Sequence, residues 1–103
     1  MIFIISNVPD EECAQRIAKE LVSSRLAACV NILPPIHSVY RWDGKVEEAR
    51  EITIFIKTRA ALYGETEDAI KKLHPYETPE IIAFPIEKGL PAYLEWIGES
   101  TTP

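Results

Sequence analysis

The residues best suited to chemistry are concentrated in one short segment, His74-Pro75-Tyr76-Glu77-Thr78-Pro79-Glu80. It combines one of the two histidines of the chain with a tyrosine and two carboxylates. Its prolines fix their own φ and push the residues before them, His74 and Thr78, toward extended backbone. Ordered polar loops often carry binding or catalytic groups. The sequence therefore predicts a rigid functional loop, with His74 as its candidate metal ligand.

Few other side chains have the chemistry to bind a soft or borderline metal ion. Apart from Met1, the set is Cys13, Cys29, His37 and His74. None of them forms a CxxC, HxH or helical HxxxH pair, so the spacing predicts no preformed zinc site. Cys13 lies on the apolar stripe of a helix, which favours a buried structural role. His74 and Cys29 are the candidate ligands for a divalent cation, although burial without a ligand role is the simpler interpretation of Cys29.

A second candidate site involves polar side chains that several elements would bring together. On the long third strand, Glu47, Glu51 and Lys57 share one face, because the side chains of a strand alternate. In an oligomer they can converge on an intersubunit cleft with Asn31, His74, Tyr76 and Glu80. Such a cleft favours either binding of a small anion with shifted proton affinities, or an ion-pair network that fixes the register between subunits. The sequence leaves both interpretations open.

Apolar patterns predict the elements that must position these groups. Asp10 is placed as the N-cap of an amphipathic helix, and Asp43-Gly44 is typical of a two-residue type I′ hairpin turn. Pro34-Pro35 predicts a bend or a sheet edge in the second strand. The expected strands are 1–5, 27–33 resuming at 36–42, 45–58 and 80–86. Three helices are expected: one after Asp10, one over 59–73 and a short one that begins at Pro91. Residues 100–103 are expected to fray.

This order of elements is typical of a ferredoxin-like α+β sandwich, in which two split βαβ units precede a C-terminal helix. Right-handed crossovers place the first and third strands at the centre of an antiparallel sheet with strand order 4-1-3-2. The second and third strands form a long hairpin. Residues 1–103 are predicted to form one domain, because a chain of this length builds a single core.

Both faces of the first and fourth strands are apolar, although only one face is expected to carry the two principal helices. Phe3 and Ile5 alternate with Ile2 and Ile4, and residues 81–84 are apolar throughout. A large uncovered apolar face is not expected on a stable monomer, so the sequence predicts that another copy of the chain covers it. Aromatic residues are common interface anchors; the candidates are Tyr40, Trp42 and Trp96.

Composition excludes several classes of function. The net charge of −5, without a basic cluster, argues against nucleic-acid binding. No apolar stretch approaches the roughly 20 residues of a membrane span, and the first residues do not resemble a signal peptide. Two widely spaced cysteines do not form a disulfide scaffold, so a reducing compartment is expected, and the expected location is the cytoplasm. No glycine pattern fits a phosphate loop and no serine or cysteine lies in a nucleophile elbow, so we expect no enzymatic activity and no required cofactor.

An ordered set of motifs resembles the CutA divalent-cation-tolerance family. The motifs are Ala28-Cys29-Val30-Asn31, Tyr40-Arg41-Trp42-Asp43-Gly44-Lys45, Lys57-Thr58, His74-Pro75-Tyr76-Glu77-Thr78-Pro79-Glu80 and Tyr93-Leu94-Glu95-Trp96. The resemblance runs from the first strand to the last helix. It implies a ferredoxin-like subunit in a tight homotrimer, with edge strands that extend sheets between subunits. It also implies a link to metal-ion tolerance, with copper the metal most often proposed, and no established reaction.

Some members of this family place a cysteine at the end of the first strand and a second histidine before the His-Pro-Tyr motif. This chain has Ser6 and Leu73 at those positions, so His74 alone represents that proposed ligand set. Two alternative functions stay open. One is a PII-like trimeric module that senses a nucleotide or small anion, although the Asp43-Gly44 turn leaves no long signalling loop. The other is a structural trimer that scaffolds a partner.

Overall fold

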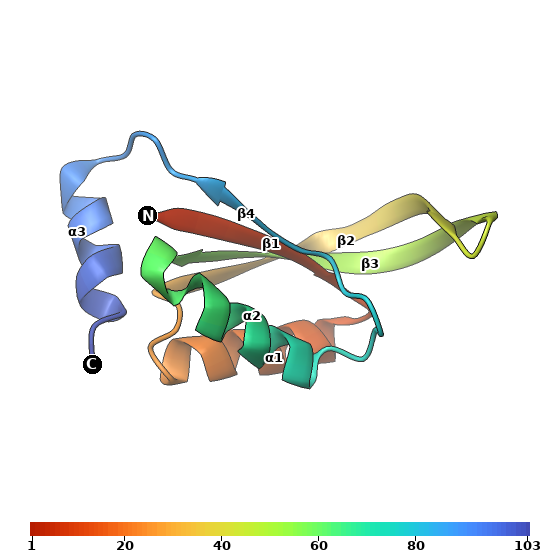
Figure 1. Ribbon diagram of the computed structural model, residues 1–103, viewed down its shortest axis with the longest axis horizontal. Helices are drawn as coiled ribbons and strands as arrows, with labels where there is room; N and C mark the ends of the chain where they lie inside the picture. Colours follow the sequence, from red (N-terminus) through yellow and green to blue (C-terminus); the bar gives the residue numbers. More distant parts are fainter.

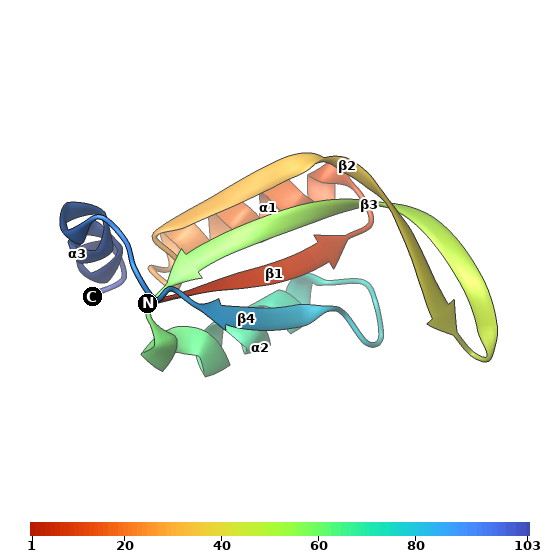
Figure 2. The ribbon, with the colours of Figure 1, turned by 90° about the horizontal axis from the view of Figure 1, so that it is seen from above.

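The computed structural model describes residues 1–103, which form a four-stranded antiparallel sheet and three α-helices. The strands lie in the order β2-β3-β1-β4, as Figure 2 shows from above the sheet. This confirms the predicted α+β architecture and its strand order. The strands are β1 (Ile2–Val8), β2 (Cys29–Trp42), β3 (Lys45–Thr58) and β4 (Ile81–Pro85). The helices are α1 (Glu11–Ser23), α2 (Tyr63–Leu73), preceded by a 3₁₀ turn at Ala60–Leu62, and α3 (Pro91–Ser100).

The core lies between one face of the sheet and the helices α1 and α2 (Figure 1). Helix α1 begins where predicted, because the Asp10 carboxylate accepts a hydrogen bond from the Cys13 amide at 2.8 Å. Alternate residues of the two central strands point into this layer and meet the apolar stripes of the helices. The core side chains without any exposed surface are Ile4, Val8, Ala14, Ile17, Leu21, Ile54, Ile56 and Ile70. Cys13 belongs to the same cluster, and burial raises the pKa of its thiol.

The opposite face of the sheet is also apolar, and α1 and α2 do not cover it. Phe3 on β1 lies opposite Phe84 on β4, and their rings stack at 5.3 Å between centroids. Phe55 on β3 meets the Phe3 ring edge-on at 5.7 Å. Ile82 and Phe84 remain 46% and 43% exposed. We call this surface, made by Phe3, Ile5, Phe55, Ile82 and Phe84, the open face. The structure thus contains the apolar surface that the sequence predicts.

Strands β2 and β3 continue beyond the rest of the sheet as a twisted hairpin arm, which makes the molecule 44 Å long (Figures 1 and 2). The arm turns at Asp43 and Gly44, whose φ angles are 51° and 75°. A type I′ turn requires positive φ at both central residues, and its twist matches that of the flanking strands. The predicted two-residue turn is therefore correct, and it leaves no loop at the tip.

Strand β2 runs without interruption through the proline pair, where the sequence predicts a bend or a sheet edge. The pairing changes from Ile32 opposite Ile54 to Pro35 opposite Ile52, so β2 gains one residue relative to β3. Such a bulge reverses which side chains face each side of the sheet. Tyr40 and Trp42, beyond the bulge, consequently share a face with Glu51.

The structure corrects several boundaries. Strand β2 begins at Cys29 rather than at residue 27, helix α2 begins at Tyr63 after a 3₁₀ turn rather than at residue 59, and β4 spans Ile81–Pro85 rather than 80–86. Strand β1 reaches Val8 rather than ending at Ile5, and this extension places Asn7 inside the sheet. The C-terminal residues do not fray as a unit, because Thr101 is 2% exposed and is held by Arg59. The Arg59 guanidinium donates hydrogen bonds to the Thr101 hydroxyl at 2.9 Å and to its carbonyl at 2.8 Å. None of the helices has the length and apolar character needed to cross a membrane.

Candidate functional site

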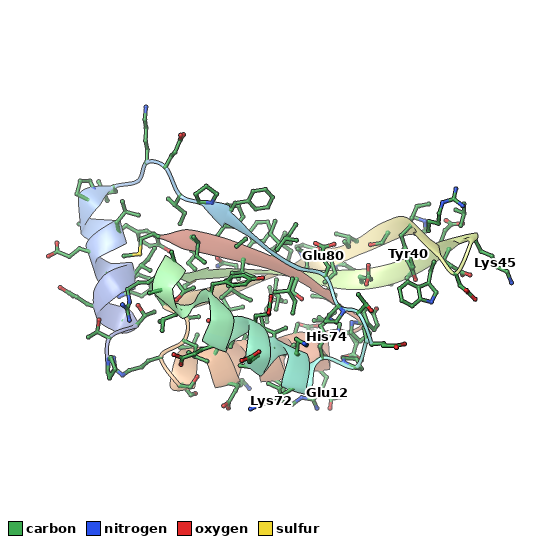
Figure 3. The ribbon with its side chains drawn as sticks, in the orientation of Figure 1. Glu12, Tyr40, Lys45, Lys72, His74 and Glu80 are labelled. Atoms are coloured by element: carbon green, nitrogen blue, oxygen red, sulfur yellow. The ribbon has the colours of Figure 1, made fainter.

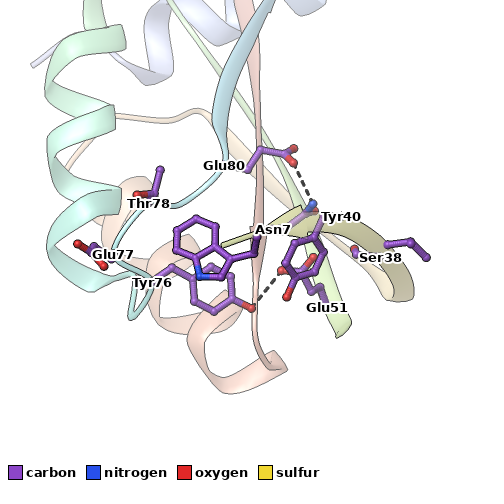
Figure 4. A pocket seen from close by; sticks show the side chains of 10 residues that line it. Asn7, Ser38, Tyr40, Glu51, Tyr76, Glu77, Thr78 and Glu80 are labelled. Carbon is purple, nitrogen blue, oxygen red and sulfur yellow. Dashed lines mark hydrogen bonds between the residues drawn. The ribbon is translucent and has the colours of Figure 1, made fainter. Parts of the chain in front are cut away.

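A pocket of about 600 Å³ lies where the hairpin arm leaves the sheet and the 74–80 loop folds against it (Figure 4). Strand β1 contributes Asn7, strands β2 and β3 contribute the arm, and the loop closes the other side. Figure 3 shows His74 and Glu80 near the base of the arm and Tyr40 further along it. No lysine or arginine lines the pocket. The lining residues are Asn7, Ser38, Val39, Tyr40, Trp42, Glu51, Tyr76, Glu77, Thr78 and Glu80.

His74 is 7% exposed and both of its ring nitrogens are occupied. Nε2 donates to the Asn7 carbonyl at 2.7 Å, and Nδ1 accepts from the Tyr76 amide at 3.2 Å. A carbonyl only accepts and an amide N–H only donates, so this geometry requires the neutral ring with its proton on Nε2. The ring also packs against that of Tyr76, with 4.7 Å between centroids. His74 therefore anchors the loop to β1.

The two predicted metal ligands do not form a metal site within one chain. Cys29 pairs with Lys57 and its thiol contacts Asn31 at 3.6 Å. Lys57 in turn pairs with Phe3 on β1, whereas His74 binds the carbonyl of Asn7 on the same strand. Phe3 and Asn7 are four residues apart, which is about 13 Å along a strand, so Cys29 and His74 lie far from each other. No group of three or more His, Cys, Asp and Glu side chains is arranged to hold a metal ion. Because His74 also has no free ring nitrogen, these residues do not fit a copper centre inside the subunit.

Asn7 connects the loop to the sheet and was not identified from the sequence. Its side-chain oxygen accepts a hydrogen bond from Thr53 at 2.6 Å, and its amide donates to Glu80 at 3.3 Å. Its backbone carbonyl accepts from His74. A polar residue shortly after an apolar run is the available signal, but the expected first strand ends at Ile5 and leaves Asn7 outside the sheet. Asn7 thereby fixes both ends of the 74–80 loop.

Glu51 and Tyr76 form the polar centre of the pocket. Glu51 is only 7% exposed, and its Oε2 accepts a hydrogen bond from the Tyr76 hydroxyl at 3.0 Å (Figure 4). Burial of the phenol, followed by this hydrogen bond and the nearby negative charge, raises the pKa of Tyr76 to about 12. Tyr76 therefore acts as a hydrogen-bond donor to the carboxylate at neutral pH.

The other predicted cleft residues lie elsewhere in the single chain. Lys57 is at the opposite end of the sheet, where its ammonium group donates to the Tyr93 hydroxyl at 3.4 Å and lies 5.7 Å from the Tyr93 ring centroid. Asn31 lies beside Cys29 at that same end. Glu47 is exposed on the arm, opposite Tyr40. The structure thus brings Glu51, Tyr76 and Glu80 together and leaves the other three apart.

The candidate interface aromatics are at both ends of the molecule. Tyr40 and Trp42 are 43% and 52% exposed on the arm. Trp96 is 42% exposed on α3 and packs against Tyr93 with 5.4 Å between ring centroids. Their interface role stays a prediction.

In the Tyr76→Phe variant, the free energy of unfolding is expected to fall less steeply with rising alkaline pH than in the wild type. Between the ordinary tyrosine pKa near 10 and the folded value of about 12, the folded chain keeps this proton and the unfolded chain loses it, so stability falls as pH rises through that window. Urea unfolding across this window measures the slope. Tyr40→Phe is the control, because the Tyr40 hydroxyl makes no hydrogen bond in the chain. Equal slopes in the two variants would contradict the assignment.

Comparison with known proteins gives a consistent family assignment. The family model described as "CutA1 divalent ion tolerance protein" matches residues 2–100. The divalent-cation tolerance protein CutA of Thermus thermophilus is 47% identical over 98 residues, which are 95% of each chain. Human Protein CutA is 45% identical over 93 residues, which are 90% of this chain and 52% of the human protein. This chain thus spans about half of that longer relative.

Solved structures agree over the whole chain. The Cut A1 structure from Thermus thermophilus superposes with a TM-score of 0.96 at 46% identity and covers 99% of this chain and 100% of that one. The structure described as the periplasmic divalent cation tolerance protein CutA of Archaeoglobus fulgidus gives a TM-score of 0.96 at 47% identity, with the same coverage. Sequence and fold therefore agree, and the chain belongs to the CutA1 divalent-ion-tolerance family.

Proposed function

We propose that this protein acts as a homotrimer that supports tolerance of divalent cations, copper among them, and that it catalyses no reaction. The observation that carries the proposal is the open face. Phe84 and Ile82 are nearly half exposed beside an aromatic cluster at the centre of the sheet. An apolar surface of this kind marks an interaction site on a soluble protein. A second copy of the chain is the most economical cover.

The two edges of the sheet support a closed ring. Strand β2 forms one edge and β4 the other, and each leaves one row of backbone groups unpaired in the single chain. Pairing the β2 edge of one copy with the β4 edge of the next joins two different surfaces, and such head-to-tail contacts close into a ring when the rotation between copies closes. The arm gives β2 the length to reach beyond its own sheet. Family membership suggests three copies in the ring.

The link to metal tolerance follows from the family. The single chain holds no group of metal ligands, so the proposed role depends on the assembled protein and not on a copper site centred on His74. The PII-like alternative is not favoured, because the two-residue turn leaves no signalling loop. The two free cysteines suit a reducing compartment, and we place the protein in the cytoplasm, which cell fractionation tests.

The proposal is tested by light scattering and by growth. Wild-type protein at micromolar concentration is expected to have three times the mass of the 11.7 kDa chain. Cells that lack their own relative of this protein are expected to regain growth in raised copper when they express it. A monomer in solution would remove the basis of the proposal. A trimer that does not restore growth would separate assembly from metal tolerance and overturn only the second part.

A further inference from the structure

We propose that the pocket at the base of the arm binds an organic cation, a guanidinium or primary ammonium group on a small molecule, with Glu51 as its counter-ion. This site goes beyond metal tolerance, and ten residues of the single chain line it. Three features carry the inference: a buried carboxylate without a cationic partner, an unoccupied oxygen on that carboxylate, and aromatic walls.

The first feature is the isolation of Glu51. The residue is only 7% exposed, and acidic residues are almost never buried unless they are paired. The only contact in the chain between a carboxylate and a basic side chain joins Glu48 and His37 on the arm. No lysine or arginine lines the pocket, whereas Glu77 and Glu80 add negative charge to it. The charge that would balance Glu51 is therefore missing from the chain.

The second feature is the free oxygen of Glu51. Oε2 accepts the Tyr76 hydroxyl, whereas Oε1 makes no hydrogen bond in the chain. Among the buried polar side-chain atoms, only the Ser6 hydroxyl lacks a partner. Oε1 of Glu51 has no partner and is not one of these buried atoms, so it is accessible from the pocket that Glu51 lines. Guanidinium and ammonium groups donate hydrogen bonds, and a bond to a carboxylate is stronger than one between neutral groups. Glu51 thus presents a charged acceptor to a ligand.

The third feature is the nature of the walls. Tyr40 and Trp42 line the side formed by the arm, and Tyr76 lines the side formed by the loop. Aromatic faces attract cations, and guanidinium, being weakly hydrated, also stacks on them. No group of three or more His, Cys, Asp and Glu side chains is arranged to hold a metal ion in this pocket or elsewhere in the chain. A volume of about 600 Å³ is typical of a small-molecule site.

The test uses Trp42 as a reporter in a Trp96→Phe background. N-acetyl-arginine methyl ester and N-acetyl-lysine methyl ester are titrated, with N-acetyl-citrulline methyl ester as the uncharged match for the first. We expect a saturable fluorescence change with at least one cationic ester and none with the citrulline ester. Glu51→Gln, which retains an acceptor for Tyr76, is expected to weaken binding by about tenfold or more.

Glu47→Gln is the matched control, because Glu47 is on the same strand and face but does not line the pocket. It is expected to bind as the wild type does. If Glu51→Gln does not fold, calorimetry on Trp42→Leu replaces it, since Trp42 is 52% exposed. No saturable response in the wild type, an equal response to the citrulline ester, or unchanged binding in the pocket variant would overturn the proposal. Light scattering on the same samples reports separately on the trimer.

Discussion

Phe84→Glu is expected to convert the assembled protein to monomers. Phe84 is on the edge strand β4 and stacks on Phe3 at the centre of the open face. A partner that covers this face would bury the new carboxylate without a cation, which costs several kcal/mol. That cost corresponds to a loss of affinity of at least about a hundredfold at each interface. Sedimentation or light scattering over a range of concentrations measures the change in mass.

Val22→Glu is the control for this experiment. Val22 is 44% exposed, close to the 43% of Phe84, but it lies on α1 in the helical layer. The same introduced negative charge at this position is expected to leave the mass unchanged. Circular dichroism of both variants shows whether the subunit remains folded. A Phe84→Glu protein with wild-type mass would show that partner contacts do not involve the open face.

His74→Ala is expected to destabilise the protein in the absence of any metal, by about 2–4 kcal/mol. The change removes the hydrogen bonds to the Asn7 carbonyl and from the Tyr76 amide, and it leaves a cavity in a site that is 7% exposed. Chemical unfolding in the presence of EDTA measures this loss. A ligand role alone predicts no loss under these conditions, because a ligand stabilises a protein only when the metal is bound.

His37→Ala provides the matched control, since His37 is the only other histidine of the chain. Its side chain is 67% exposed and pairs with Glu48 on the arm. Exposed pairs contribute little, so a change within about 0.5 kcal/mol is expected. Unfolding is then repeated with Cu²⁺. The anchoring role would be wrong if His74→Ala had wild-type stability in EDTA and lost only a copper-dependent increase.

The local features of the fold followed from the sequence. The Asp43-Gly44 turn, the Asp10 cap and the two helical stripes each depend on residues close together in the chain. The strand order follows from crossover rules that apply to any chain with this order of elements. Prolines beside ionisable residues predict that 74–80 is a shaped loop, and ordered polar loops often carry function, so the functional role of this loop stays a prediction. The roles of its residues did not follow from the same pattern.

The sequence by itself determined the elements, their order and the apolar open face, because propensity and alternation are properties of neighbouring residues. Only the tertiary structure decided how the site is built. The extra residue of β2 between Ile32 and Pro35 places Tyr40 and Trp42 on the face of Glu51, and that shift exists only in register with β3. Likewise, the nitrogens of His74 are occupied because Nε2 meets the carbonyl of Asn7, 67 residues away. Such contacts arise from packing, and no local pattern contains them.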